Sequence, residues 1–435
     1  MSGLRKTGLL VLLLPLIVPG RIEAQNVLTL KECYEAALAV NSLSGEKEAY
    51  SGISELKQKN INAGWLPVLD LNANALYNSE VVDLSSALGS LPLPGIAGAI
   101  KPMPHDQYKV TLDINQVIYD GGSVKNARQL EKADLRINEK QTETDLYKLR
   151  SQVNNYYFNI LLLKRQEELL GIYIELLQKK LRSVQSAVEN GVMLRSDADI
   201  LRSEMINLQQ QVSENEIRSN SLITALSDIT GKDINSLTEF ELPTQESEFS
   251  QDITRPELQL FDLRNDQLSA SESLARSKRM PRAFGFATLG YGNPPGSNFF
   301  RDQFDTYYII GAGLKWNIFD WNKVKNEKQI ISLQKNIISN RKKDLTDNLK
   351  RQLELKEAEI SNLEKMTGSD KELAEIRKRI TASAESQLEN GTITSTEYLN
   401  ILNSERQVMI NSEIHSINLA LARVEYLNIS GKDLE

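Results

Sequence analysis

Apolar side chains recur along a long stretch of the chain at alternating steps of three and four residues. In the first half the series is Leu146, Leu149, Val153, Tyr156, Ile160, Leu163, Glu167, Leu170, Ile174, Leu177, Leu181, Val184 and Val188. Only Glu167 is not apolar. A repeat of 3.5 places one stripe against a partner helix and predicts a left-handed coiled coil. No proline interrupts 123–190 or 321–390. A helix of ~65 residues is roughly 100 Å long, which indicates a spacer.

Both rods are predicted to end in the same way. The sequence Glu-Asn-Gly occupies 189–191 and again 389–391. Asparagine and glycine tolerate the left-handed conformation of a helix C-cap, so each rod should stop there. Ser196 and Thr396 follow a few residues later, and each is predicted to cap a helix that returns along the first. Each half of the chain therefore predicts a long antiparallel helical hairpin with a tight tip.

The second half of the chain repeats the first. Four motifs return at an offset of 200 residues: Ile118-Tyr119-Asp120 as Ile318-Phe319-Asp320, Val124-Lys125-Asn126 as Val324-Lys325-Asn326, Glu189-Asn190-Gly191 as Glu389-Asn390-Gly391, and Gly231-Lys232-Asp233 as Gly431-Lys432-Asp433. Self-similarity on this scale indicates one duplicated structural unit. The predicted parts are a signal peptide (1–24), a first repeat (25–231), a linker (232–255) and a second repeat (256–435). The long helices are expected at about 122–189, 196–230, 322–389 and 396–430.

Ahead of each rod the hydrophobic period changes from helical to two. Strands are predicted at about 66–77, 108–118, 282–291 and 306–318. The third is the least regular, because Phe284 and Phe286 fall opposite Ala283, Gly285 and Ala287. The lengths are close to the ~9–11 residues that cross a bilayer when tilted. An ordinary antiparallel sheet with one wet face is the alternative, although the flanking rods could not all cover it.

Four strands cannot close a barrel, and open sheet edges are not tolerated in lipid. If these strands enter a membrane, several chains must share one barrel. Two chains would give eight strands with a filled lumen, and three would give twelve strands with room for a pore.

The N-terminus reads as a secretory signal. Arg5 and Lys6 precede an apolar run over 8–19, and Ala24 offers a cleavage site. The net charge of −7 gives no encouragement to nucleic-acid binding. The single cysteine, Cys33, excludes an intrachain disulfide and is interpreted as a small hydrophobe on a helix face.

The sequence contains no constellation that favours an enzyme. His105 and His415 lie far apart, and neither an HExxH spacing nor a Gly-x-Ser-x-Gly motif occurs. Asp120-Gly121-Gly122 lacks the spacing of a phosphate-binding loop and predicts a tight strand-to-helix turn. We therefore expect no catalytic residue, no cofactor and no metal.

Several short motifs occur in a recognisable order across the two repeats. They are Leu28-Thr29-Leu30-Lys31-Glu32, Ala63-Gly64-Trp65-Leu66-Pro67, Asp120-Gly121-Gly122, Gly191 with Ser196 and Asp199-Ile200-Leu201, Thr230-Gly231, and Arg255-Pro256-Glu257-Leu258. In this order the chain resembles the TolC-type family of outer-membrane efflux and secretion channels. The resemblance covers everything after the signal peptide.

The resemblance implies a mainly α fold with transmembrane β-strands. Each repeat would give two barrel strands and a long coiled-coil helical hairpin. A homotrimer would build a 12-stranded barrel in the outer membrane and an α-helical tunnel in the periplasm. The resemblance also implies a periplasmic adaptor and an inner-membrane transporter as partners, in a tripartite efflux pump or a type I secretion system. Substrates would pass through without chemistry.

The resemblance also assigns roles to the hairpin tips. The residues expected to contact the adaptor are Gly191, Leu194, Ser196, Gly391, Thr394 and Thr396. Asp197 and Glu397 map onto an acidic ring at the periplasmic mouth, which would favour cations. Helix capping explains both carboxylates equally well on local grounds. The second acidic position of the ring falls on Asn400, and a basic residue that latches the closed state falls on Ile393.

Two other functions stay open at this stage. A soluble periplasmic coiled-coil scaffold, or the adaptor itself, would also have long helical hairpins, although usually one per chain. A channel of the same class could export polypeptides instead of small toxic compounds.

Overall fold

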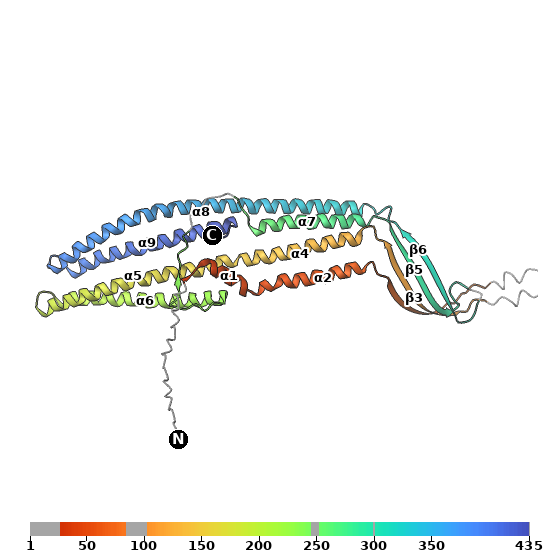
Figure 1. Ribbon diagram of the computed structural model, residues 1–435, viewed down its shortest axis with the longest axis horizontal. Coiled ribbons are helices and arrows are strands. Elements are labelled where there is room, and N and C mark those ends of the chain that lie inside the picture. Colours follow the sequence, from red (N-terminus) through yellow and green to blue (C-terminus); the bar gives the residue numbers. More distant parts are fainter. Residues whose placement is uncertain (1–26, 84–101, 245–251, 299–300, 435) are drawn as a thin grey trace, which may run out of the picture. The chain divides into compact units, whose positions relative to one another are not determined.

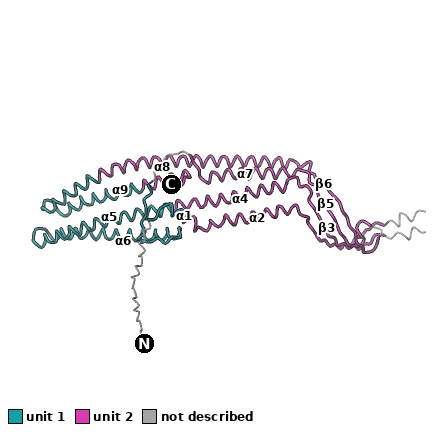
Figure 2. Tube along the Cα trace, viewed as in Figure 1, with its two compact units in different colours: residues 1–36, 153–244, 374–417 teal, residues 37–152, 245–373, 418–435 magenta. Residues whose placement is uncertain are grey.

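The computed structural model describes residues 27–83, 102–244, 252–298 and 301–434. The predicted signal peptide and part of the linker therefore lie outside the described residues. The chain divides into two compact units (Figure 2). Unit 1 comprises Met1–Ala36, Val153–Thr244 and Ala374–Ile417, and unit 2 comprises Ala37–Gln152, Gln245–Leu373 and Asn418–Glu435. Each unit draws on both repeats, so the compact units do not coincide with the repeats.

Long helices make up most of the described chain (Figure 1). The helices are α1 (Leu30–Val40), α2 (Glu46–Ala63), α4 (Ser123–Tyr147), α5 (Leu149–Glu189), α6 (Arg195–Thr230), α7 (Pro256–Ser277), α8 (Lys323–Glu389) and α9 (Ser395–Ser430), with a 3-10 turn, η1, at Ser42–Gly45. Helix α8 runs for 67 residues without a break. The first rod is not the single helix expected from the sequence, because it is divided at Lys148 into α4 and α5. No helix in the described ranges is long and apolar enough to span a bilayer.

The break at Lys148 coincides with a docking point for the end of α9. The guanidinium groups of Arg150 and Arg255 both lie against the Tyr147 ring, each 4.6 Å from the ring centroid. The Tyr147 hydroxyl donates a hydrogen bond to the carbonyl of Asn428 at 2.8 Å. Cations near an aromatic ring are attracted by its quadrupole. Arg255 and Asn428 lie far from Tyr147 along the chain, so the helical period alone could not have predicted the break.

Four strands form one antiparallel sheet in unit 2, and a two-stranded parallel ladder lies in unit 1. The larger sheet has the order β2-β3-β5-β6, with β2 at Val68–Tyr77, β3 at Asp106–Tyr119, β5 at Arg282–Asn293 and β6 at Asp305–Lys315. The ladder pairs β1 (Val27–Leu28) with β4 (Glu239–Phe240). The hydroxyl of Tyr157 donates to the carbonyls of Leu28 and Glu241, which ties the ladder to α5. Cys33 is fully buried on α1, as expected of a small hydrophobe.

The register gives the larger sheet one apolar and one polar face. One row of opposed residues is Leu71, Leu112, Leu289 and Tyr308, and the next row is Asp70, Asp113, Thr288 and Ile309. Adjacent rows point to opposite faces. On the polar face the carboxylate of Asp113 accepts hydrogen bonds from Thr288 at 2.6 Å and from Asn72 at 2.8 Å. This is the alternation that the sequence predicts for a sheet with one apolar side.

The structure explains why Phe284 and Phe286 break the pattern of β5. They lie on the polar face, where Phe284 is opposite Gly313 and Phe286 is opposite Gly311. A Cβ atom on Gly311 would clash with the Phe286 ring, and one on Gly313 would lie 2.5 Å from the Phe284 ring. Each ring therefore covers a glycine of the neighbouring strand, which supplies the packing that glycine lacks.

A capped turn joins the sheet to each rod. The carboxylate of Asp120 accepts from the amides of Gly122 at 2.8 Å and Val124 at 2.5 Å. In the second repeat, Asp320 accepts from the amide of Val324 at 3.1 Å. The tight strand-to-helix turn predicted at Asp120-Gly121-Gly122 is therefore present, and the aspartate holds the first free amides of the helix.

Gly121 is the residue of this turn that tolerates no side chain. Its φ is +69°, in the left-handed region, and a Cβ atom there would lie 2.6 Å from Cβ of Met280. The second repeat places Trp321 at φ 53° and Asn322 at φ 63° in the same turn. The turn of the second repeat therefore tolerates residues with side chains in the left-handed conformation. At Gly121 the neighbouring Met280 leaves no room for a side chain.

Replacing Gly121 with alanine is expected to lower thermal stability. The left-handed conformation costs an L-residue about 1–2 kcal/mol, and the clash with Met280 adds to this. Gly171→Ala is the control, because Gly171 is helical and has open space around its Cβ position. It should raise stability by about 0.5–1 kcal/mol. The measurement is the thermal unfolding midpoint of the purified proteins, and equal midpoints for both variants would contradict the packing argument.

Candidate functional site: the hairpin tips

The two tips are closed by the same backbone turn. Gly191 has φ +72° and Gly391 has φ +69°. The amide of Gly191 donates to the carbonyl of Val188 at 3.0 Å, and the amide of Gly391 donates to the carbonyl of Leu388 at 3.0 Å. Both glycines are exposed, with open space at the Cβ position. Only the left-handed backbone, which ends the helix as the sequence predicts, requires glycine there.

The caps of the returning helices are not where the sequence placed them. Helix α6 begins at Arg195 and α9 at Ser395, so Ser196 and Thr396 lie inside the first turns. The prediction of these two residues as N-caps was wrong, because the chain turns into the helix two residues earlier. The capping positions are Leu194 and Thr394.

The second tip has a full capping box and the first has half of one. The Thr394 hydroxyl accepts from the Glu397 amide at 3.2 Å, and the Glu397 carboxylate accepts from the Thr394 amide at 2.8 Å. These bonds hold the pKa of Glu397 below its usual range, first through the Thr394 amide and then through its hydroxyl. At the first tip Leu194 has no polar side chain, and Asp197 accepts only from the Leu194 amide, at 3.2 Å.

The side chains predicted to meet a partner are on the surface. Leu194 is 71% exposed, and its neighbour Val192 is 77% exposed. Ser196, Thr394 and Thr396 are also exposed. Of the two predicted gate carboxylates, Glu397 is exposed and Asp197 is half-buried. The first tip therefore presents the apolar Val192 and Leu194 beside the hydroxyl group of Ser196, and the second presents the hydroxyl groups of Thr394 and Thr396.

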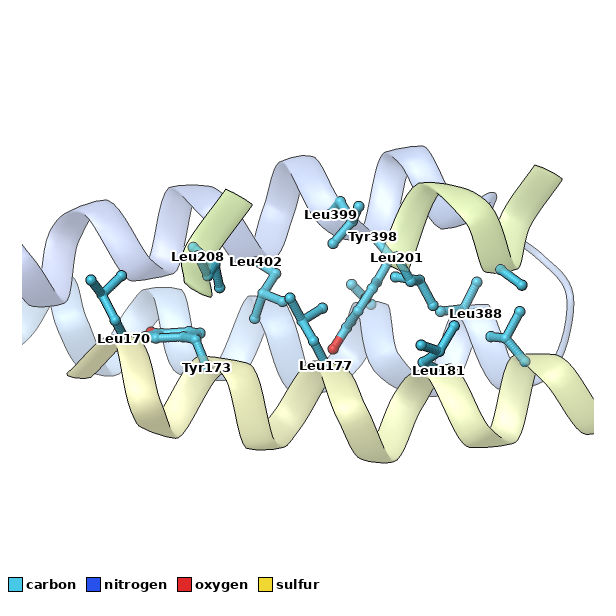
Figure 3. Packing of buried hydrophobic residues seen from close by; sticks show 13 residues of the cluster. Leu170, Tyr173, Leu177, Leu181, Leu201, Leu208, Leu388, Tyr398, Leu399 and Leu402 are labelled. Carbon is cyan, nitrogen blue, oxygen red and sulfur yellow. The ribbon is translucent and has the colours of Figure 1, made fainter. Parts of the chain in front are cut away.

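Below the tips, the two hairpins share one apolar core in unit 1 (Figure 3). From the first hairpin, Leu177 and Leu181 of α5 meet Leu201 of α6, and from the second, Leu388 of α8 meets Tyr398 of α9. The α5 residues belong to the stripe of period 3.5. The structure thus brings the two tips, and with them both groups of predicted contact residues, to one end of unit 1.

A buried lysine joins the two hairpins beside this core. Lys180 of α5 is 5% exposed, and its Nζ lies 2.8 Å from Glu389 Oε1 and 2.9 Å from Glu385 Oε1, both on α8. Burial alone would lower the pKa of Lys180, but hydrogen bonds to Glu389 and Glu385 outweigh burial and raise that pKa. The same contact holds the pKa of Glu389 below its usual range. A cavity of about 230 Å³ lies next to it, lined by Val192 and Gly391 among others.

Sequence reasoning missed the Lys180 contact. Lys180 lies on α5 directly before Leu181 of the stripe, a flanking position where a charged residue normally reaches solvent. Position 380 of the second repeat is isoleucine, so the duplication gave no hint of a repeated pair. The sequence shows that Lys180, three residues after Leu177, lies beside the apolar stripe. It does not show which residues of α8 bind that lysine.

A second contact between the hairpins lies where Ser203-Glu204 of the first repeat corresponds to Ser404-Glu405 of the second, at an offset of 201 residues instead of 200. Glu204 of α6 forms an ion pair with Arg406 of α9 at 2.9 Å, and both side chains are 15% exposed. Its counterpart Glu405 accepts from the hydroxyl of Tyr173 on α5 at 3.4 Å. Equivalent glutamates of the two repeats thus each bind the opposite hairpin.

Long paired helices preceded by pairs of antiparallel strands define the TolC-like class of channel folds, and solved structures confirm it. The Campylobacter jejuni CmeC outer membrane channel matches with a TM-score of 0.65 and 15% identity, over 92% of this chain and 85% of that one. VceC, an outer membrane protein of Vibrio cholerae, matches with a TM-score of 0.66 and 14% identity, over 93% and 97%. The open state of the Neisseria gonorrhoeae MtrE outer membrane channel matches with a TM-score of 0.65 and 14% identity, over 93% and 89%.

A family model also matches part of the chain. Residues 59–231 match the model of the family described as "Outer membrane efflux protein". No curated protein matches the chain significantly. The family match and the shared fold confirm the resemblance to TolC-type outer-membrane channels and the mainly helical TolC-like fold that the sequence predicted.

Removing the Thr394 cap is expected to destabilise the second tip. Thr394→Ala should cost about 1 kcal/mol, the usual loss for an N-cap threonine. Thr396→Ala is the matched control, since Thr396 lies inside the first turn of the helix with its side chain exposed and should change stability by less than about 0.5 kcal/mol. Hydrogen exchange of the amides at 394–398 measures the difference. An equal effect of the two variants would show that the capping box is not what holds this tip.

The capping contribution should also depend on pH. The pKa of Glu397 is lowered by folding, so its stabilisation is present above the unfolded value of 4.5 and is lost as the pH falls through the lowered folded pKa. The difference in amide exchange at 394–398 between the native protein and Glu397→Gln should therefore shrink in acid. A difference that stays constant from neutral pH into acid would contradict this role of the charge.

Lys180→Met is expected to loosen the contact between the hairpins. Without the cation, Glu385 and Glu389 repel each other one turn apart, and amide exchange over 385–394 should become about two- to fivefold faster, a small effect because both carboxylates are partly hydrated. Lys179→Met is the control, because Lys179 is exposed. In this variant, amide exchange over 385–394 should stay unchanged. A slower exchange in Lys180→Met would mean that apolar packing outweighs the ion pair.

Proposed function

We propose that this protein is a trimeric outer-membrane channel. It serves as the exit duct of a tripartite efflux pump or a type I secretion system. The observation that carries the proposal is the sheet β2-β3-β5-β6, which has an apolar face and two edge strands, β2 and β6, with no partner strand among the described residues. Lipid tolerates no open edge, so β6 of one copy must pair with β2 of the next. Three copies give twelve strands, enough for a barrel with a pore.

The apolar face of the sheet supports its placement in lipid. Leu71 is 76% exposed, Tyr308 is 74% exposed and Ile310 is 76% exposed. Their two rows contain leucine, isoleucine, alanine and tyrosine. Contiguous apolar surface of this kind marks contact with a membrane or a partner. The polar face, with Asp70, Asn72 and Asp113, would then line the water-filled lumen.

The helical hairpins would form the periplasmic tunnel, and their tips would meet the adaptor. We assign this contact to Gly191, Leu194 and Ser196 of the first tip and to Gly391, Thr394 and Thr396 of the second. Exposed apolar groups beside exposed hydroxyl groups suit a partner helix that buries apolar side chains and keeps a polar rim. The inner-membrane transporter would contact the adaptor and select the cargo.

We assign the acidic mouth of the tunnel to Asp197 and Glu397. Capping and gating are compatible at Glu397, because the bonds it accepts from Thr394 both use Oε2 and the carboxylate keeps its charge at the surface. In a trimer these residues would supply six carboxylates around one opening, which would attract cations and repel anions.

Single-channel recording in a planar bilayer tests the proposal. The detergent-extracted protein should insert and give uniform conductance steps that favour cations. Asp197→Asn/Glu397→Gln should reduce the preference for cations, because the mouth loses its charge. Asp228→Asn/Glu413→Gln is the control, since it removes the same charge from α6 and α9 far from the tips along each helix.

The outcomes separate the parts of the proposal. Unchanged selectivity in the tip variant, with normal conductance, would leave the channel standing and remove the gate role of Asp197 and Glu397. A protein that stays soluble without detergent and never inserts would overturn the channel and favour a periplasmic coiled-coil scaffold or adaptor.

A further inference from the structure

A cavity lies on the polar face of the sheet, where its strands meet the helices. Its volume is about 370 Å³, within the range of sites that bind small organic molecules. The residues that matter for its chemistry are Val68, Val117, Asp120, Arg282, Phe284 and Lys315. They come from β2, β3, the Asp120 turn, β5 and β6, so the sheet itself builds the site.

Two cations face each other at the rim of this cavity. Arg282 is paired in register with Lys315 as the terminal pair of β5 and β6. Like charges directly opposite each other in antiparallel strands are destabilising. Neither side chain has an ion pair or hydrogen bond to any residue that the structure describes, and both are exposed. The fold therefore keeps an unfavourable pair with no partner in the described chain to neutralise it.

The one carboxylate in the lining does not compensate these charges. Asp120 is 8% exposed, and its oxygens accept from the amides of Gly122 and Val124. Its charge is directed at the start of α4, where a helix favours a negative charge. The cavity therefore presents net positive charge.

Part of the cavity lining is apolar. The Phe284 ring lies against Gly313, where a Cβ atom would be 2.5 Å from it. Val68 and Val117 lie on the same face of the sheet, on β2 and β3. An aromatic ring supported from below offers its other face for stacking. Two cations beside an aromatic and aliphatic surface match a molecule with an anionic head and an apolar body.

We propose that this cavity binds amphipathic organic anions. The carboxylate, sulfonate or phosphate of the ligand contacts Arg282 and Lys315, and its ring or short chain packs on Phe284, Val68 and Val117. Arginine suits this role because its guanidinium binds such oxygens through two parallel hydrogen bonds. The assignment of the ligand as a solute in transit rests on the proposed channel, in which the polar face lines the lumen.

The test is block of the channel by naphthalene-2-sulfonate, added on the side of the bilayer where the barrel opens. The current should fall in a concentration-dependent way, whereas uncharged 2-naphthol should have little effect. Arg282→Gln/Lys315→Gln should raise the half-blocking concentration at least tenfold. Lys109→Gln is the control, because Lys109 is a cation of the same face near the other end of the sheet. It should leave the block unchanged. Equal block in the native protein and the double variant would overturn the proposal.

A lipid headgroup is the other possible source of the anion. The recordings are therefore made in phosphatidylcholine bilayers and again with phosphatidylglycerol added. Block of equal strength in both supports a solute from the lumen. Loss of the block on addition of phosphatidylglycerol would mean that lipid fills the cavity, and it would overturn the solute assignment.

A binding measurement separates this inference from the channel proposal. Equilibrium dialysis of naphthalene-2-sulfonate against the detergent-purified protein needs no conductance, and the double variant corrects for uptake by the micelle. Binding that is tenfold weaker in the double variant than in the native protein would support the cavity even if no current were seen. Equal binding would overturn the cavity even if the channel conducts normally.

Discussion

The unpaired edges of β2 and β6 are the constraint on which the rest of the structure depends. Each edge leaves a row of backbone amides and carbonyls without a strand partner in the described chain. In water such an edge promotes aggregation by pairing with strands of other chains, and in lipid each unpaired backbone group costs several kcal/mol. Four strands are also too few to curl into a closed barrel. In the proposed channel, closure through further copies would resolve both problems, and duplication of the chain would reduce the number of copies needed.

The two repeats share the residues that set the backbone at turns and tips, but differ at some of the side chains that join the two hairpins. Both repeats keep an aspartate that caps the rod, at Asp120 and Asp320, and both keep the glycine at the tip. The Lys180 contact between the hairpins is not duplicated, because Lys180 has isoleucine as its counterpart and binds two carboxylates of the other repeat. The two repeats have thus become complementary instead of identical.

The period of the apolar residues was enough to predict most of the helices and strands of the fold. The stripe from Leu146 to Val188 and the alternation of the strands follow from one physical requirement, which is to keep apolar groups on one side. The features that periodicity missed depend on partners far along the chain. The break at Lys148 coincides with contacts to Arg255 and Asn428, and the departure of Phe284 from the alternation needs a glycine on the adjacent strand.

The caps show the same limit on a shorter scale. Ser196 and Thr396 were plausible caps by residue type, but the geometry of the turn placed the caps two residues earlier. Residue preference at a cap is worth about 1 kcal/mol, too little for residue type alone to fix the position of the cap. At the second tip, only the structure separates Thr394, which caps the helix, from Thr396, whose side chain is exposed inside the first turn.

The pair Arg282–Lys315 illustrates how stability and function can be told apart in a single chain. Opposite charges at these positions would stabilise the ends of β5 and β6 by a few tenths of a kcal/mol, and a glutamine at either would relieve the repulsion. Stability therefore gives no reason for two cations there. Asp120 could have neutralised them, yet its carboxylate is held by the helix amides. What remains is a positive rim over an apolar floor, and the simplest physical reason to keep both is a negative charge that the described chain does not supply.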